Sequence, residues 1–167
     1  GGSVEINQLE IQGYHPGRGA QVLVSGMPVG AVGELHPDIS NQLHLPRRVA
    51  IFEVDLDALF EHAPEVLQAA ELKVMPAATQ DLSLVVADSI PAGDLLRVIR
   101  EGAGELLESV ELIDDYRGQG LPTASKSLTF ALVFRASDRT LTQAEASASR
   151  DAAVALANAR FGAELRA

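Results

Sequence analysis

The sequence predicts an α+β protein whose second half has the element order β-α-β-β-α-β around a four-stranded antiparallel sheet. Residues 127–135 carry the prediction, because large apolar and small or polar side chains alternate there as in a half-buried strand. Residues 109–116 are also rich in strand-forming residues. Glycines and a proline lie between the two segments, in a connection too long for a two-residue hairpin turn. We therefore expect an antiparallel pair at the centre of this sheet.

The composition limits the classes of function. The chain of 167 residues has no cysteine, which excludes thiol chemistry and cysteine-ligated metals and fits a reducing compartment such as the cytoplasm. The formal net charge of −10 opposes nonspecific binding to nucleic-acid phosphates, since such binding normally uses a basic surface. No apolar run of about 18 residues and no charged-then-apolar leader is present, so we expect neither a membrane span nor a signal peptide.

The first part of the chain, residues 4–62, shows short strands separated by turns. The preceding Gly1-Gly2-Ser3 is typical of a cloning scar. In residues 4–62 we predict strands at 20–25, 29–32 and 49–54, with a turn at 26–28. We also predict a helix ending near Leu43 and a helix at 55–61 that is capped by Asp55. Three strands with little helix rarely form a stable unit, so we interpret this part as the edge of a larger sheet. Residues 63–74, which begin near Pro64, are the predicted linker.

The second part, residues 75–167, begins with a strand and a helix. Residues 80–86 alternate as a strand with Leu82, Leu84 and Val86 inward. Pro91 stands at the expected first position of a helix, where a missing backbone N–H costs no hydrogen bond, and the helix should run to about Ala103.

A second helix and a final strand complete the pattern. Thr142 and Glu145 have the spacing of a capping box, and Gly162 supplies the left-handed stop after a helix to Arg160. The expected packing stripe of this helix is Ala148, Ala152, Leu156 and Ala159. Residues 163–166 are the predicted last strand. This ferredoxin-like arrangement places both helices on one face of the sheet and leaves the other face free.

The free face is the candidate functional surface. It should carry small hydroxyls, a tyrosine and a carboxylate, which are suited to stacking on an unpaired base and to hydrogen bonding at its edge. The side chains assigned to this face are Ser83, Val85, Ser127, Thr129 and Arg135, with some of Asp114, Tyr116 and Arg117. An ordinary solvated sheet surface and a docking surface for another domain remain open. Asp115 does not fit the two-face assignment, and a β-bulge would repair it.

Other candidate sites are weak. The four histidines lack the clustered spacing of metal sites, and no nucleophile–base pair or complete cofactor fingerprint is present. We therefore expect no catalytic residue, no metal ligand and no cofactor in this part of the protein.

Four segments in a fixed order resemble the C-terminal part of the β subunit of bacterial phenylalanyl-tRNA synthetase. They are Tyr14 to Pro37 (YHPGRGAQVLVSGMPVGAVGELHP), Leu45 to Leu59 (LPRRVAIFEVDLDAL), Gln80 to Val86 (QDLSLVV) and Leu106 to Thr142. The resemblance implies that residues 4–62 end an inactive, class II synthetase-like catalytic module. It implies that residues 75–167 form a ferredoxin-fold anticodon-binding domain. Two positions depart from the common family pattern, where Gln80 replaces an arginine and Gly19 replaces a serine.

The resemblance also assigns residues on the free face. The positions of Asp114, Tyr116 and Ser127 match the family's contacts to the anticodon of the phenylalanine tRNA. The tyrosine would stack on a base, the carboxylate would accept hydrogen bonds from a base edge, and the serine would add a polar contact. Further RNA contacts could come from Ser83, Arg117, Thr129 and Arg135.

The same resemblance implies a complete enzyme that attaches phenylalanine to its tRNA with ATP and magnesium in the cytoplasm. Its catalytic residues would belong to an α subunit, in an α2β2 heterotetramer, so none is assigned here. Two alternatives come from other classes of protein. One is a ferredoxin-like regulatory module that binds a small metabolite, and the other is a structural tail that docks one subunit onto another.

Overall fold

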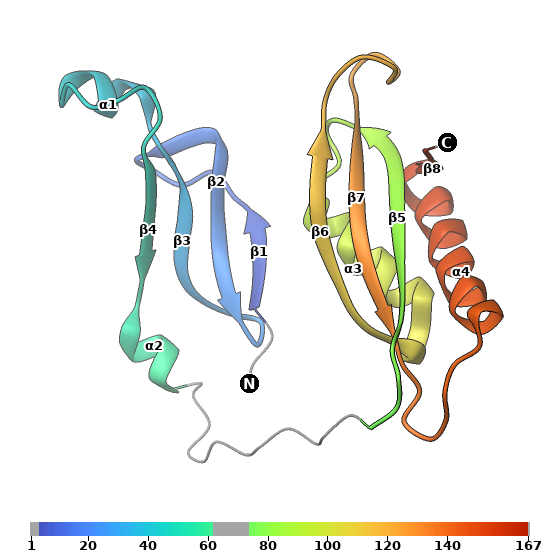
Figure 1. The fold of residues 1–167 in the computed structure, drawn as a ribbon. Helices are drawn as coiled ribbons and strands as arrows, with labels where there is room; N and C mark the ends of the chain where they lie inside the picture. Colours follow the sequence, from blue (N-terminus) through green and yellow to red (C-terminus); the bar gives the residue numbers. More distant parts are fainter. Residues whose placement is uncertain (1–3, 62–73, 167) are drawn as a thin grey trace. The chain divides into compact units, whose positions relative to one another are not determined.

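The structure is a computed structural model that describes residues 4–61 and 74–166. Contacts between Cα atoms divide the chain into two units, residues 1–69 and 70–167. Figure 1 shows the helices and strands of each unit. The predicted cloning scar and all of the predicted linker except Val74 lie outside the described residues.

The first unit is a four-stranded antiparallel sheet with two short helices. The strands follow each other in the order β1-β2-β3-β4. The elements are β1 (Val4–Gln8), β2 (Tyr14–Val24), β3 (Met27–Leu35), α1 (Pro37–Gln42), β4 (Ala50–Val54) and α2 (Leu56–Glu61). Three of these strands overlap the predicted ones, whereas β1 was not predicted as a separate strand. All five β1 side chains are exposed, so it lacks the alternation that marks a half-buried strand.

The hairpin between β2 and β3 is tighter than predicted. Ser25 and Gly26 form its two-residue turn, with φ angles of 51° and 81°, and Val24 lies opposite Met27. Positive φ at both central positions is the signature of a type I′ turn, which matches the twist of the flanking strands. The predicted turn at 26–28 was therefore wrong in position. Pro28 lies inside β3 beside a register shift, where a proline is tolerated.

The first unit has little core of its own. Asp55 caps α2 as predicted, and its Oδ1 accepts hydrogen bonds from the amides of Asp57 and Ala58 at 3.0 Å each. Among the described residues of this unit, Tyr14 and Val29 are the buried hydrophobic side chains. Its large exposed hydrophobic side chains are Val4, Ile6, Leu9, Met27, Leu43, Leu45, Phe52, Leu56 and Phe60. The unit therefore buries much less apolar surface than the second one.

The second unit has the predicted β-α-β-β-α-β order. Its elements are β5 (Ala78–Ala87), α3 (Ala92–Ala103), β6 (Leu107–Tyr116), β7 (Ser125–Phe134), α4 (Gln143–Phe161) and β8 (Glu164–Leu165), with a short 3-10 turn at Gly104–Leu106. The sheet has the order β6-β7-β5-β8 and all its pairs are antiparallel. The α+β class and the ferredoxin-like topology are thus confirmed.

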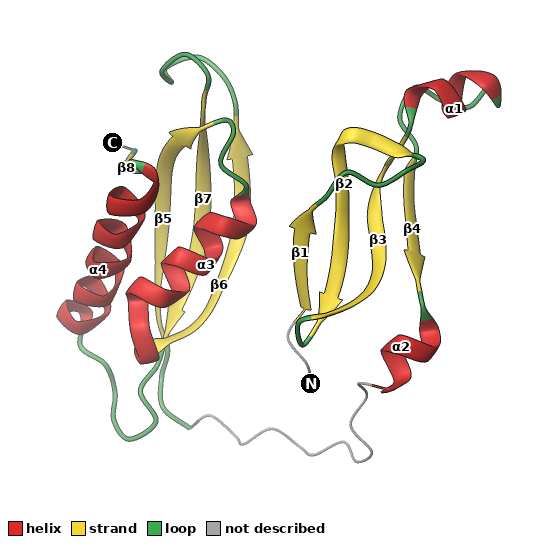
Figure 2. Cartoon of the chain, turned by 180° about the vertical axis from the view of Figure 1, so that it is seen from behind, coloured by secondary structure: helices red, strands yellow, loops and turns green. Residues whose placement is uncertain are grey.

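Both helices of the second unit cover the same face of its sheet. Figure 1 shows α3 behind β5, β6 and β7, with α4 beside β5, and Figure 2, from behind, shows α3 in front of the strands. The two helices pack against each other, and both contribute side chains to the one core. The core lies between these layers and includes Leu82, Leu84, Val86, Leu95, Val98, Ile99, Leu128, Phe130, Leu132 and Phe134. The alternation along β7 thus puts its large side chains under the helices and its small ones on the helix-free face.

The contact between α3 and α4 requires small residues. A Cβ added at Gly102 of α3 would lie 2.6 Å from the Cα of Ala153 in α4, so the backbones approach too closely for a side chain at this position. The alanines of α4 that are buried are Ala146, Ala153 and Ala157. The predicted stripe was wrong, since Ala148, Ala152 and Ala159 are exposed and Leu156 is only half-buried.

The capping box at the start of α4 is confirmed. The Thr142 hydroxyl accepts a hydrogen bond from the Glu145 amide at 3.3 Å, and the Glu145 carboxylate accepts one from the Thr142 amide at 2.9 Å. Arg139 pairs with the same carboxylate at 2.5 Å. The Thr142 amide bond first, and then Arg139, lower the pKa of Glu145 to about 2. Gly162, with φ 62°, ends the helix in the left-handed conformation as predicted.

Candidate nucleic-acid interface

A bulge in β6 determines which of its side chains reach the helix-free face. Leu112 pairs with Phe130 and Asp114 pairs with Thr129, so Ile113 is an extra residue between two consecutive pairs. Beyond the bulge, Asp115 lies opposite Leu128, whose side chain is in the core. The predicted bulge is therefore present, but it does not remove the misfit: Asp115 stays on the helix-covered side, where its carboxylate pairs with Arg117.

The bulge places the three main predicted residues in two adjacent rows of one face. Directly paired residues in antiparallel strands share a face. One row runs from Asp114 of β6 through Thr129 of β7 to Ser83 of β5. The next row is Tyr116, Ser127 and Val85. We call these six positions the open face.

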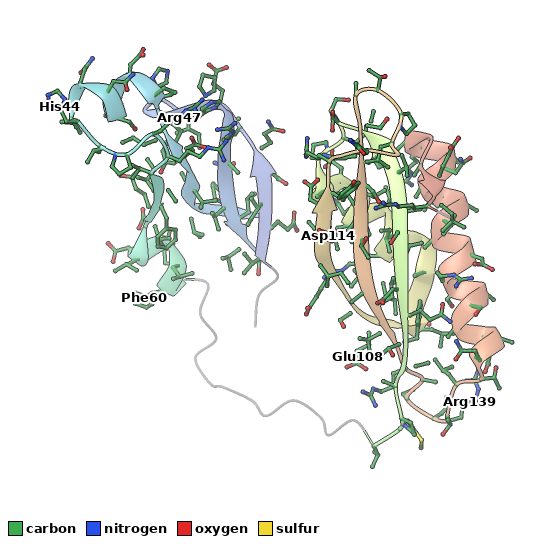
Figure 3. The ribbon with its side chains drawn as sticks, turned by 45° about the horizontal axis from the view of Figure 1, so that its top comes forward. His44, Arg47, Phe60, Glu108, Asp114 and Arg139 are labelled. Carbon is green, nitrogen blue, oxygen red and sulfur yellow. The ribbon has the colours of Figure 1, made fainter. Side chains whose placement is uncertain are left out.

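The first row is a polar strip. The hydroxyls of Ser83 and Thr129 share a hydrogen bond of 2.9 Å, so each already satisfies part of the other's bonding capacity. Asp114 is exposed at the end of the row (Figure 3). Within the described part of the chain its carboxylate has no hydrogen-bond or ion-pair partner, and its oxygens are free to accept hydrogen bonds.

Tyr116 is half-buried and held in a defined orientation. Its hydroxyl donates a hydrogen bond to the carbonyl oxygen of Gln119 at 3.1 Å. A Cβ added at Gly118 would lie 2.6 Å from that hydroxyl oxygen, so the loop after β6 closes tightly over this end of the ring. The guanidinium carbon of Arg166 lies 4.7 Å from the ring centroid, which is a cation–π distance.

Ser127 is on the predicted face but is not accessible. Its side chain has 0% exposure, and its Oγ has no hydrogen-bond partner. Arg166 follows β8, and its amide bonds to the Ser83 carbonyl oxygen at the β5 edge of the sheet. From that edge, its side chain reaches the Tyr116 ring, which lies in the same row as Ser127. The expectation of an exposed Ser127 was therefore wrong.

The two arginines proposed as further RNA contacts are engaged within the protein. Arg117 pairs with both carboxylate oxygens of Asp115 at 3.1 Å and with Asp88 at 3.1 Å. The hydrogen bonds with Asp115 are the main reason that the pKa of Arg117 is raised. Arg135 pairs with Glu108 and donates to the carbonyl oxygen of Met75. Contact with RNA would require either arginine to exchange these partners.

Lys126 is a further cation, at the start of β7, which sequence reasoning missed. It precedes Ser127 and lies opposite Val86, on the helix-covered side. Only 5% of the residue is exposed, and its Nζ donates to the carbonyl oxygen of Asp88 at 3.2 Å. Burial is the main cause that lowers its pKa. This lysine stabilises the end of the sheet and is not available for RNA phosphates.

Arg166 was also missed, although a signal for it was present. Residues 163–166 were predicted as a strand, and antiparallel pairing with β5 puts Leu165 opposite the buried Leu84. Alternation then puts Arg166 on the helix-free face. What could not be predicted is that β8 pairs with β5, since a two-residue strand carries almost no pairing information.

Gln80, one of the two departures from the family pattern, has a structural role. Its Nε2 donates a hydrogen bond to the Ser147 hydroxyl at 3.1 Å, which connects β5 to α4. Gly19, the other departure, is in a crowded position. A Cβ there would lie 3.1 Å from the Leu9 carbonyl oxygen.

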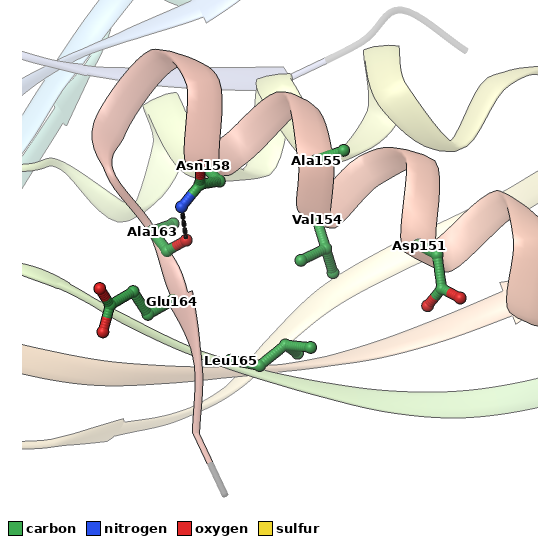
Figure 4. A pocket seen from close by; sticks show the side chains of 7 residues that line it. All are labelled: Asp151, Val154, Ala155, Asn158, Ala163, Glu164 and Leu165. Atoms are coloured by element: carbon green, nitrogen blue, oxygen red, sulfur yellow. Dashed lines mark hydrogen bonds between the residues drawn. The ribbon is translucent and has the colours of Figure 1, made fainter.

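A groove between α4 and β8 is one place in the described residues where a small metabolite could bind (Figure 4). Apolar atoms come from Val154 and Leu165, and carboxylates come from Asp151 and Glu164. The Asn158 amide is already bonded to the Ala163 carbonyl oxygen at 3.0 Å. These carboxylates could attract the ammonium group of an amino acid, but no described lysine or arginine lines the groove to bind its carboxylate. The groove therefore gives no support to the metabolite-binding alternative.

The described ranges contain no group of three or more histidine and acidic side chains that could hold a metal ion. In the same ranges, no helix is both long and apolar enough to cross a membrane.

Comparison with known families assigns both parts of the chain. Residues 74–166 match the ferredoxin-fold anticodon binding domain. The chain belongs to this family. Residues 2–56 match the phenylalanyl tRNA synthetase beta chain CLM domain. The anticodon-binding domain match covers the whole unit that carries the open face.

Curated relatives are similar over nearly the whole chain. Phenylalanine–tRNA ligase beta subunits are 57% identical in Leifsonia xyli (99% of this chain, 20% of that protein) and 47% identical in Corynebacterium efficiens (98% and 19%). The Mycobacterium leprae subunit is 48% identical (92% and 18%). The chain spans about a fifth of the length of these relatives.

Proposed function

We propose that this chain is the anticodon-recognition part of the β subunit of a phenylalanine–tRNA ligase. The observation that carries the proposal is a helix-free sheet face with an oriented tyrosine, a free carboxylate and hydroxyls, in a domain of the anticodon-binding family. Residues 75–167 are the recognition domain, and residues 4–62 belong to the neighbouring catalytic-like module. The similarity of the whole chain to ligase beta subunits supports this division.

The complete enzyme would use ATP and magnesium in the cytoplasm to attach phenylalanine to its tRNA. It would do so together with an α subunit, in an α2β2 assembly. The described residues bring together no metal-ligating group, and no step of the proposal passes through a metal ion. The role of this part is to bind and orient the tRNA.

The side chains of the open face suggest how an unpaired base would bind. The Tyr116 ring offers a stacking surface, and its hydroxyl bond to Gln119 keeps the ring in place before binding. The Asp114 carboxylate can accept hydrogen bonds from the amino and imino groups of a base edge. The Ser127 hydroxyl has no partner in the free chain and gains one if the base reaches it. Thr129 and Ser83 would add polar contacts.

The charge of the domain favours recognition of bases over attraction to phosphates. Arg117 and Arg135 are paired with carboxylates, and the net charge of the chain is −10. Few phosphate contacts imply that affinity depends weakly on salt, because the salt dependence follows the number of phosphates neutralised.

The experiment compares Tyr116→Ala with Tyr116→Phe in the intact enzyme, by titration with phenylalanine tRNA and by aminoacylation. Loss of the ring should weaken tRNA binding by about 1–3 kcal/mol, whereas phenylalanine keeps the stacking surface and loses only the hydroxyl bond. Arg139→Ala is the control, because Arg139 pairs with Asp138 and Glu145 at the start of α4, away from the open face. Unchanged binding and aminoacylation in Tyr116→Ala would refute the assignment.

A further inference from the structure

Arg166 differs from the other arginines of the second unit in what it contacts. The described arginines at 97, 117, 135, 139, 150 and 160 each have a carboxylate within ion-pair distance. Arg100 and Arg166 have none among the described residues, and Arg100 lies on α3, on the helix-covered side. The side chain of Arg166 instead lies against the Tyr116 ring, 4.7 Å from its centroid.

This contact uses the surface that the proposed function needs. A planar guanidinium stacks on an aromatic ring much as a base does, and both prefer the same exposed ring face. The backbone of Arg166 is fixed at the other edge of the sheet by its amide bond to the Ser83 carbonyl oxygen at 3.0 Å. The side chain is therefore the part that can leave the ring while β8 stays in place.

The buried Ser127 hydroxyl is a second, independent observation that points to a ligand on the open face. A buried hydroxyl without a partner is unfavourable, and most such groups in proteins are satisfied. Ser127 has 0% exposure, lies in the row beside Tyr116, and has no partner for its Oγ. A ligand that separates Arg166 from Tyr116 would give this hydroxyl access to a hydrogen-bond partner.

We propose that Arg166 caps the Tyr116 ring in the free chain, and that an incoming unpaired base takes its place and reaches the Ser127 hydroxyl. The inference rests on the proposed function, because it specifies how the same face opens for RNA. When a base binds, the cation–π contact between Arg166 and Tyr116 is replaced by stacking of the base on Tyr116. The Ser127 hydroxyl then gains a hydrogen-bond partner. The cap therefore makes the face selective, since a ligand must stack well enough to displace the arginine.

The position of Arg166 can be followed by NMR of the whole chain with an anticodon stem-loop RNA. In the free chain, the side-chain methylene protons of Arg166 should be shifted upfield by the Tyr116 ring, and Tyr116→Leu should abolish that shift. On addition of the stem-loop, the Arg166 protons should return to ordinary positions while Tyr116 and Thr129 signals move. An Arg166 that shows no ring shift in the free chain, or that keeps it in the complex, overturns the cap.

Affinity provides the second measurement, with Arg100→Ala as a control that removes the same charge from the helix-covered side. At a salt concentration that screens single charges, Arg166→Ala should bind the stem-loop roughly 2–5-fold more tightly than Arg100→Ala, which is the range of an exposed cation–π contact. If Arg166→Ala binds the stem-loop no more tightly than Arg100→Ala does, Arg166 and the base do not compete for the Tyr116 ring. A stem-loop that perturbs no open-face signal in any variant refutes the proposed function itself, whereas binding that leaves Arg166 on the ring refutes only the cap.

Discussion

Replacing Ser127 by alanine should make the second unit more stable and its RNA binding weaker. The Ser127 Oγ is buried and has no hydrogen-bond partner in the free chain. An unsatisfied buried hydroxyl costs about 1–3 kcal/mol, which alanine would recover. The small void left by the oxygen atom offsets only about 0.4 kcal/mol, at roughly 24 cal/mol per Å³ of cavity. We therefore expect Ser127→Ala to raise the free energy of unfolding by about 0.5–2.5 kcal/mol.

Ser83→Ala is the matched control for this prediction. Ser83 lies on the same face in the neighbouring strand, and its hydroxyl shares a 2.9 Å hydrogen bond with Thr129. The same substitution there breaks a bond, so it should lower the free energy of unfolding by about 0.5–1.5 kcal/mol. The lost hydroxyl has a partner at the half-buried Ser83 and none at the fully buried Ser127, so the two effects should have opposite signs.

Hydrogen exchange of the β7 backbone amides measures this effect in the second unit alone. Phe130 and Leu132 lie in the central strand, flanked by β5 and β6, and their exchange reports the most stable opening of the sheet. Slower exchange in Ser127→Ala, together with weaker stem-loop binding, would mark the hydroxyl as kept for function at a cost in stability. Faster exchange, as in Ser83→Ala, would refute the reasoning.

Two further predictions concern the helices that support the open face. Gly102→Ala should destabilise the second unit by about 1–3 kcal/mol, because the new Cβ would meet the Ala153 backbone. Gly93→Ala, at an exposed position of the same helix, should be neutral or slightly stabilising in the same urea titration; equal losses would disprove the close contact. The pKa of Glu145 is about 2 in the folded chain against an ordinary 4.5, so its contribution to stability is complete above pH 4.5 and is lost as the pH falls toward 2. Glu145→Gln should show a shallower fall of Tm across that range, and identical slopes would contradict the capping role.

The sequence predicted the parts of this site that depend on strand periodicity. Leu128, Phe130 and their alternating neighbours assign the two faces of β7 without knowledge of the partner strands. The misfit of Asp115 predicted a bulge in this strand, and a bulge is present, although Asp115 itself stays on the helix-covered side opposite Leu128. The capping box of α4 could also be predicted, since its hydrogen bonds join residues only three positions apart.

Features that depend on distant contacts could not be predicted in this way. The buried side of α4 is ambiguous because alanines occur all around the helix, and the close approach to Gly102 decides its orientation. The contact of Arg166 with the Tyr116 ring joins residues that lie 50 positions apart in the sequence. The carboxylate partners of Arg117 and Arg135 likewise come from other segments. The local sequence pattern therefore identifies the open face, but it does not show which of the side chains there are buried or paired.

The extra residue in β6 also changes the exposed edge of the sheet. β6 is the ten-residue outer strand of its sheet, and its exposed Leu112 and Ile113 would suit pairing with a strand from another chain. The bulge at Ile113 interrupts the row of outward amides and carbonyls, so a foreign strand cannot follow it in continuous register. A single inserted position thus places Asp114 and Tyr116 on the open face and also interrupts the regular pairing of the outer strand.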